Sequence, residues 1–306
     1  TPRADRIDWI RDAMLVGMSV EDIYEYTHID PWFLDQLEEL VNHEKLLSEA
    51  VKNGIEGIDA DSLRHTKQLG FCDRQIAAAC PEGQDEWHVR AHRKALGIIP
   101  AFKRVDTCAG EYPSQTPYLY STYSGTEDEV DSQPQTQAPK STKKRVIVLG
   151  GGPNRIGQGI EFDYCCVHAA LALRELGYET IMVNSNPETV STDFDTSDML
   201  FFEPLTHEDV MNVIDRLDPH GVIVQFGGQT PLNLARGLKD HGAPLVGTSV
   251  DSIETAEDRD LFSQLITKLK IDQPPNGLAA TAEQALAAAA SIGYPVLVRP
   301  SFVLGG

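Results

Sequence analysis

The strongest constraint on the fold is a change of hydrophobic pattern near residue 145. From there, short apolar runs of strand length stand at 146–149, 180–183, 200–202, 222–224 and 245–246. Segments long enough to form helices separate several of these runs, at 162–176, 207–217 and 231–241. Parallel strands require a crossover connection, which is usually a helix, so this alternation predicts a doubly wound α/β domain with a parallel sheet.

The first hundred residues have the period of helices instead. Apolar residues recur at helical spacing, as Ile7, Ile10, Met14 and Met18 and again as Phe33, Leu37, Leu40 and Val41. Ser19 followed by Asp22 predicts a capping box, and Asp30 before Pro31 predicts an N-cap with proline in the first turn. Glycine-rich phosphate loops are missing from this half of the sequence, so its pattern indicates packing or interaction rather than catalysis.

A polar segment separates the two patterns. Residues 124–144 consist almost entirely of Gly, Ser, Thr, Gln, Asp, Glu, Lys and two prolines, with Val130 as the one sizeable apolar residue, which predicts a solvated linker. After the α/β pattern, residues 257–270 and an alanine-rich stretch at 282–291 predict helices, and 296–298 predicts a strand. This last part is too short to close a domain. Since the chain also begins at Thr1, we expect both ends to continue in a longer protein.

Composition restricts the possible partners. A formal net charge of -20 repels phosphate backbones, so the chain is not expected to bind nucleic acid. No apolar run is long enough for a membrane span, and no membrane partner is expected. The five cysteines form no C-x-x-C pair, which indicates reduced thiols in a reducing compartment. Histidines and cysteines also lack zinc-site spacing, so no metal site is predicted within the chain.

A glycine-rich loop at 150–159 follows the first predicted strand. Glycines there would let backbone amides approach a ligand and would expose the N-terminus of a helix. The dinucleotide fingerprint G-x-G-x-x-G nevertheless fails, because it requires glycine at its sixth position. That position is Arg155 when the motif starts at Gly150 and Phe162 when it starts at Gly157. The second strand ends in Asn184 rather than in an acid that could bind a ribose. An NAD-binding oxidoreductase is therefore the weaker alternative.

Acidic residues follow the same strands. Glu161 and Asp163 stand beside the glycine loop, and Glu188 follows the second strand. A second glycine turn, at 225–231, follows the fourth strand and opens a helix. Because ligands of open α/β sheets bind outside the carboxyl ends of the strands, these residues are candidates for a binding site. Their types alone leave open whether the acids are solvated surface groups and whether the glycines serve only packing.

Several motifs resemble those of the carbamoyl phosphate synthetase large-subunit family. The most specific are GGGPNRIGQGIEFDY at 150–164, VNSNPETVST at 183–192, VQFGGQTP at 224–231 and RPSFVLGG at 299–306. The segments KRVDTCAGE at 103–111 and YLYSTY at 118–123 resemble the connection between the two halves of that family. Trp32, Phe33 and 38–40 resemble its helical oligomerisation region. The resemblance is weakest at 80–101 and in the linker.

The resemblance implies a multi-domain architecture. An all-α oligomerisation domain with a connecting segment would occupy 1–123, and the acidic, polar linker would occupy 124–144. A Rossmann-like pre-ATP-grasp α/β domain would follow at 145–256, and an ATP-grasp domain would begin at 257–306. The family forms carbamoyl phosphate from bicarbonate, glutamine-derived ammonia and two ATP, and it uses two similar ATP-grasp halves joined by a tunnel. This chain would open the second half, which phosphorylates carbamate.

The resemblance also implies roles for individual residues. Arg259 and Arg299 would contact ATP, and Gly305 and Gly306 would begin a loop over its phosphates. The carbamate tunnel would be lined by Gly159, Glu161 and Glu188. ATP and Mg2+ would be the cofactors, with the metal ligands expected beyond residue 306, so no catalytic site is expected to be complete in this chain.

The implied partners are a glutamine amidotransferase small subunit and further copies of the chain, bound through the helical domain. The implied location is the cytoplasm, or an organelle in a eukaryote. The chief alternative function is that of an assembly module alone.

Overall fold

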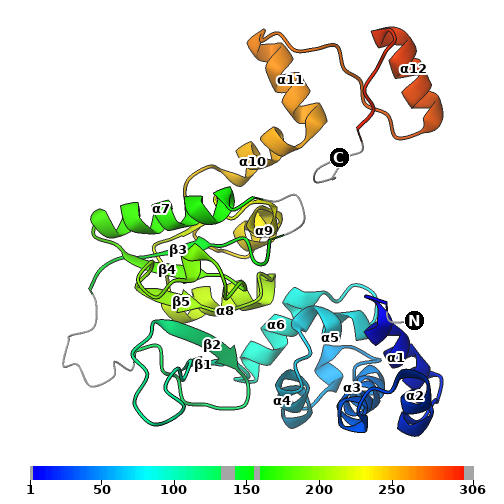
Figure 1. The fold of residues 1–306 in the computed structure, drawn as a ribbon, viewed down its shortest axis with the longest axis vertical. Helices are drawn as coiled ribbons and strands as arrows, with labels where there is room; N and C mark the ends of the chain where they lie inside the picture. The colour runs from blue at the N-terminus through cyan, green and yellow to red at the C-terminus, as the bar shows by residue number, and fades with distance from the viewer. Residues whose placement is uncertain (1–2, 132–141, 155–158, 300–306) are drawn as a thin grey trace. The chain divides into compact units, whose positions relative to one another are not determined.

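The computed structural model describes residues 3–131, 142–154 and 159–299. It divides into two compact units (Figure 1). The helical unit comprises Thr1–Lys103 with Ser121–Glu129, and the α/β unit comprises Arg104–Tyr120 with Val130–Gly306. The connecting segment that we grouped with the helices is therefore shared between the two units.

The helical unit consists of short helices joined by tight turns. Its elements are α1 (Arg6–Leu15), α2 (Val20–Thr27), α3 (Pro31–Ala50), the 3-10 turn η1 (Ile55–Gly57), α4 (Ala60–Gln68), α5 (Asp73–Ala79) and α6 (Glu86–Ala95). The capping box of Ser19 and Asp22 is confirmed at the start of α2. Asp30 accepts a hydrogen bond from the Trp32 amide at 2.9 Å, which confirms the predicted cap of α3.

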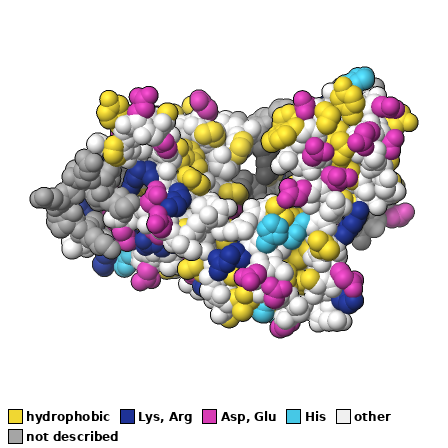
Figure 2. Space-filling view, turned by 90° about the horizontal axis from the view of Figure 1, so that it is seen from below, with side chains coloured by type: hydrophobic (Ala, Val, Ile, Leu, Met, Phe, Trp, Pro, Cys, Tyr) yellow, Lys and Arg dark blue, Asp and Glu magenta, His cyan; other side chains and the backbone are white. Residues whose placement is uncertain are grey.

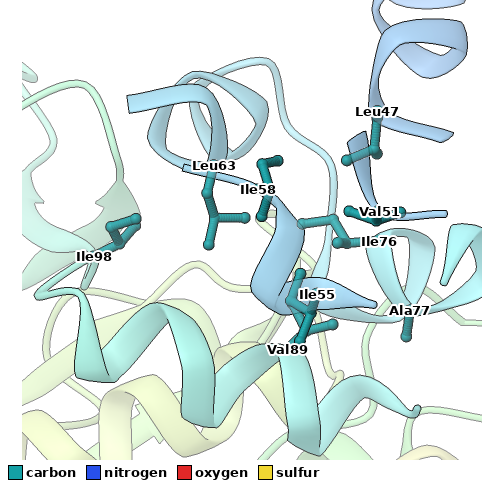
Figure 3. Packing of buried hydrophobic residues seen from close by; sticks show 9 residues of the cluster. All are labelled: Leu47, Val51, Ile55, Ile58, Leu63, Ile76, Ala77, Val89 and Ile98. Atoms are coloured by element: carbon teal, nitrogen blue, oxygen red, sulfur yellow. The ribbon is translucent and has the colours of Figure 1, made fainter. Parts of the chain in front are cut away.

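Two apolar clusters form the core of this unit, and α3 contributes to both. The first contains Ile10, Met14, Val20, Ile23, Leu34 and Val41. The second, shown in Figure 3, contains Leu47, Val51, Ile55, Ile58, Leu63, Ile76, Ala77, Val89 and Ile98. Burying each of the larger side chains contributes about 1.5–3 kcal/mol, so these clusters hold the short helices together.

A buried charged network lies among α4, α5 and α6. The Asp73 carboxylate accepts hydrogen bonds from Arg93 Nε at 2.8 Å and from Lys67 Nζ at 3.1 Å. All three residues are at most 4% exposed. The Tyr123 ring lies 5.1 Å from the Lys67 ammonium and 5.7 Å from the Arg93 guanidinium, within cation–π range. The network thus holds segment 121–129 against the helices, a role that sequence spacing did not reveal.

The α/β unit is built on the predicted parallel sheet. Its strands are β2 (Tyr118–Thr122), β3 (Arg145–Leu149), β4 (Glu179–Val183), β5 (Met199–Phe201) and β6 (Gly221–Ile223), and with β1 (Ala101–Arg104) the sheet order is β1-β2-β5-β4-β3-β6. The pairs β2–β5, β5–β4, β4–β3 and β3–β6 are all parallel. The prediction of strands alternating with helices is confirmed for this sheet.

Helices cover both faces of the central strands. Their bounds are α7 (Glu161–Glu175), α8 (His207–Leu217) and α9 (Gln229–Asp240). Val148 and Met182 pack with Cys166 and Ala170 of α7. Their strand neighbours Ile147 and Ile181, whose side chains point to the opposite face, are also fully buried. Burial on both faces explains why these strands are continuous apolar runs in the sequence.

The last part of the chain departs from the prediction. It contains α11 (Arg259–Leu269) and α12 (Ala282–Ile292), which agree with the predicted helices, and α10 (Val250–Glu257), which was not predicted. The strand predicted at 296–298 is wrong, because these residues form no ladder with any strand in the described part of the chain, and Leu297 is 94% exposed. The strand predicted at 245–246 is reduced to one bridge between Val222 and Leu245.

The predicted linker is held at its first residues. The Glu129 amide donates to the Phe102 carbonyl at 2.8 Å, within the helical unit. Val130 is 8% exposed, and the Asp131 carboxylate accepts from Arg216 Nη2 at 3.1 Å, within the α/β unit. The segment 132–141 lies outside the described residues. None of the helices in the described ranges is long and apolar enough to cross a membrane.

Candidate functional site

Three loops meet the description of a ligand site in an open α/β sheet. They follow the carboxyl ends of β3, β4 and β6 and comprise residues 150–154, 184–189 and 225–228. We call them the carboxyl-edge loops. Since β3 lies between β4 and β6 in the sheet, the loops are neighbours in space. Their position agrees with the one predicted from the sequence.

The glycines of these loops are required by contacts between the loops. A Cβ atom on Gly150 would lie 2.5 Å from the Asn184 amide nitrogen, and one on Gly151 would lie 2.8 Å from the Gly227 carbonyl oxygen. A Cβ on Gly227 would lie 2.5 Å from the Leu149 carbonyl oxygen. Gly152 also has a φ of +72°, which side chains rarely adopt. In the described loops these glycines therefore serve close packing, one of the two readings that the sequence left open.

Asn184 joins the carboxyl-edge loops through its side chain, which is 1% exposed. Its Oδ1 accepts hydrogen bonds from the Gly152 amide at 3.0 Å and from the Asn186 amide at 3.1 Å. Its Nδ2 donates to Ser191 Oγ at 3.0 Å, in the 3-10 turn η2 (Val190–Thr192). These three hydrogen bonds connect the loops after β3 and β4.

Asp163 extends this network to helix α7. It lies in the first turn of α7 and is 8% exposed, and its Oδ2 accepts from the Ser191 amide at 2.9 Å. Glu161, two residues earlier, is exposed, because helix positions i and i+2 point in different directions. The two acids that the sequence placed together therefore have different surroundings, one structural and one open to solvent.

The remaining predicted tunnel residues lie before α7 and on the loop after β4. Gly159 lies two residues before the start of α7, and a Cβ added there would meet the flexible end of the Glu161 side chain, at 1.9 Å from Oε2. Glu188 is exposed on the loop after β4, where its amide donates to Asn186 Oδ1 at 3.0 Å. Gly159, Glu161 and Glu188 thus flank the Asp163–Asn184 network.

The predicted ATP contacts lie in the last part of the chain. Arg259 is the first residue of α11, and its Nη1 lies 3.5 Å from the backbone carbonyl of Arg299. Both arginines are exposed. The structure therefore brings these two residues together, although 40 positions separate them. Gly305 and Gly306 lie outside the described residues.

Metal ligation has no site in the described part of the chain. Among residues 3–131, 142–154 and 159–299, no group of three or more His, Cys, Asp or Glu side chains could hold a metal ion. The exposed acids of the carboxyl edge can instead repel or guide anions and can accept hydrogen bonds.

Two adjacent cysteines beside this network should differ in reactivity. Burial raises the pKa of the Cys166 thiol to about 12, and the nearby Asp163 charge adds to the effect, whereas Cys165 is exposed. Because the thiolate is the nucleophile, we expect iodoacetamide at pH 8 to alkylate Cys165 and to spare Cys166 in the native protein. Peptide mass spectrometry measures both. Equal labelling before denaturation would contradict the buried position of Cys166, and denaturation in urea should equalise the two.

The sheet and its crossover helices define a doubly wound α/β domain, and the loops at its carboxyl edge form the candidate site. Comparison with known protein families identifies the family to which this domain belongs. Residues 142–255 match the carbamoyl phosphate synthase preATP-grasp domain, residues 1–97 match the oligomerisation domain of the carbamoyl-phosphate synthetase large chain, and residues 258–306 match the ATP binding domain of the same chain. The chain belongs to the carbamoyl phosphate synthase large-chain family.

Curated relatives agree with this assignment over the whole chain. It is 57% identical to the carbamoyl phosphate synthase large chain of Rhodopirellula baltica and 56% identical to that of Archaeoglobus fulgidus, with 100% of this chain covered in both. The chain spans 27% of the length of these relatives.

A solved structure, the biotin carboxylase domain of Hydrogenobacter thermophilus 2-oxoglutarate carboxylase, matches 54% of this chain and 36% of its own, at 21% identity and a TM-score of 0.39. A likeness of that size has no bearing on function.

Proposed function

We propose that the complete protein is an ATP-dependent carbamoyl phosphate synthase that uses bicarbonate, ammonia and two ATP. The chain described here would supply the oligomerisation domain and the beginning of the half that phosphorylates carbamate. The observation that supports this most strongly is the succession of three family matches at 1–97, 142–255 and 258–306, all to parts of one large chain. An assembly module without catalysis is the second candidate, supported by the oligomerisation match alone.

The proposed reaction transfers the γ-phosphoryl group of ATP to a carbamate oxygen and releases ADP. Negative charge spreads over the equatorial oxygens of the transferred group, so catalysis depends on cations held in position. Arg259 and Arg299 suit this role, because guanidinium groups bind phosphate oxygens in a bidentate manner and both side chains are exposed. Gly305 and Gly306 would belong to the loop over the phosphates. Mg2+, when bound with ATP, would neutralise further phosphate charge.

Carbamate needs a path protected from water between the two phosphorylation steps. We propose that Gly159, Glu161 and Glu188 line this path. The absence of a side chain at 159 leaves room for the Glu161 carboxylate, because a Cβ there would lie 1.9 Å from Oε2. Excluding water from an intermediate prevents its loss by hydrolysis, so the walls of the path determine how much product each ATP yields.

Narrowing this path should waste ATP. We expect Gly159→Leu in the complete enzyme to raise the ADP released per carbamoyl phosphate, by roughly twofold or more, because carbamate escapes before it is phosphorylated. The fold should persist, since the nearest atom to the new side chain is the mobile end of Glu161. Gly125→Leu is the control, as its Cβ would lie 3.7 Å from Lys103 Cε, an ordinary contact. A wild-type ratio of ADP to carbamoyl phosphate in Gly159→Leu would contradict the assignment of Gly159 to the path.

The helical unit presents a surface suited to self-association. Large apolar side chains are exposed on α1, α2 and α3, among them Trp9, Tyr26, Trp32 and Phe33. Aromatic residues are enriched in the cores of protein interfaces. Figure 2 shows hydrophobic and acidic side chains interspersed on the face that it displays. We propose that this unit binds further copies of the large chain, that a glutamine amidotransferase small subunit supplies ammonia, and that the enzyme acts in the cytoplasm.

A further inference from the structure

We propose that Asp163 and Asn184 are positioning residues that hold Glu161 and Glu188 at the carbamate path. The inference rests on the proposed function, since the path itself is part of that proposal. Asp163 and Asn184 are buried. We infer that they act indirectly, through the helix turn that carries Glu161 and the loop that carries Glu188.

The Asn184 side chain fixes the loop that carries Glu188. It accepts from the Asn186 amide at 3.1 Å and donates to Ser191 Oγ at 3.0 Å. Glu188 lies between these two contacts, and its own amide donates to Asn186 Oδ1 at 3.0 Å. Both ends of this short segment are therefore held by one buried side chain, which restrains the backbone that carries Glu188.

Asp163 connects the same segment to the helix turn that carries Glu161. Its carboxylate accepts from the Ser191 amide at 2.9 Å and is 8% exposed. Glu161 belongs to the same turn of α7. From Glu161 through Asp163 and Ser191 to Asn184, the chain of contacts consists of helix backbone and buried hydrogen bonds. From Asn184 it reaches Glu188 through Asn186, by one part-buried and one exposed hydrogen bond. A charge-assisted hydrogen bond to a buried carboxylate is short and directional, so it suits a fixed spacing.

The hydrophobic core beneath these loops is separate from the network. Val148, Met182 and Leu200 pack against Cys166 and Ala170 without using the Asp163 carboxylate or the Asn184 amide. Loss of the network should therefore move Glu188 and the first turn of α7, which carries Glu161, while the sheet and the rest of α7 stay packed. This separation allows positioning to be distinguished from folding by experiment.

The test measures ADP released per carbamoyl phosphate formed by the complete enzyme with bicarbonate, ammonia and MgATP. Asp163→Ala removes the acceptor for the Ser191 amide and should raise this ratio by roughly twofold or more. Asp163→Asn retains an acceptor oxygen of the same reach and should return the ratio to the wild-type value. Asn184→Ala should raise it as Asp163→Ala does. If Asp163→Ala does not fold, Asp163→Ser, whose hydroxyl is too short to reach the Ser191 amide, takes its place.

Leu238→Ala is the control for stability. Leu238 is fully buried in α9 and takes no part in the network, so this variant should lower thermal stability and leave the ratio unchanged. Wild-type coupling in Asp163→Ala or Asp163→Ser would overturn the positioning role. So would an Asp163→Asn variant as uncoupled as Asp163→Ala. A wild-type enzyme that forms no carbamoyl phosphate would instead overturn the proposed function.

Discussion

Gly227→Ala should be among the most damaging single substitutions in the α/β unit. A Cβ at this position would lie 2.5 Å from the Leu149 carbonyl oxygen and 2.6 Å from the carbonyl group of Gly150. These are backbone atoms of the loop after β3, so they can yield only if the loop moves. Such overpacking costs about 3 kcal/mol. Amides of β3 and β4 that exchange through unfolding of this unit should therefore exchange about a hundredfold faster.

Hydrogen exchange followed by mass spectrometry measures this effect in the complete protein. Gly125→Ala is the matched control, because its new methyl group would meet the Lys103 side chain at 3.7 Å, and surface changes of this kind fall within about 0.5 kcal/mol. Protection of β3 in Gly227→Ala equal to that of the control would contradict the close approach of the two glycine loops.

Asp73→Ala should have a comparable effect on the helical unit. The substitution removes the carboxylate that Lys67 and Arg93 share, and both of these cations are almost completely buried. Removing one partner of a buried ion pair costs about 3–5 kcal/mol, because the remaining charge is left desolvated. Amides of α4 and α6 should lose protection accordingly, while those of β3 report the unaffected unit.

A compensating variant sharpens this test. Replacing Lys67 and Arg93 with methionine in the Asp73→Leu background removes the buried charges together, which is often neutral when volumes are similar. The amides of α4 and α6 should then regain most of the protection from hydrogen exchange that Asp73→Ala removes. If Asp73→Ala costs less than about 1 kcal/mol, the network is solvated rather than buried.

Local patterns predicted the helices and the central strands because their apolar periodicity reflects burial. The caps at Ser19 and Asp30 were predictable for a different reason, since each depends only on residues within one turn. Strand β2 was not predicted, although Tyr and Thr in its sequence YLYST favour strands, because five residues show no clear period and the strand forms by pairing with β5, where Tyr118 lies opposite Leu200. The run at 296–298 shows the converse, an apolar stretch that forms no strand without a neighbour.

The position of the site was predictable, and the roles of its residues were only partly so. Alternating strands and helices place the loops after β3, β4 and β6 at one edge. The need for glycine at position 227 could not be predicted, because the atom that a Cβ would meet there belongs to Leu149, far away in the sequence. The two-residue spacing of Glu161 and Asp163 on a helix was a usable signal that they differ in burial. No spacing could have connected Lys67, Asp73 and Arg93 across three helices.

The most direct test of the central claim is ATP formation from ADP and carbamoyl phosphate by the complete protein. This is the reverse of carbamate phosphorylation, the step that we assign to the half beginning in this chain. We predict that Arg299→Ala lowers this rate by at least about tenfold, because a guanidinium contact to the transferred phosphoryl group is lost. Bicarbonate-dependent ADP release, the reaction of the other half, should persist. ATP formation at the wild-type rate in Arg299→Ala, or its absence from the wild-type protein, would contradict the account.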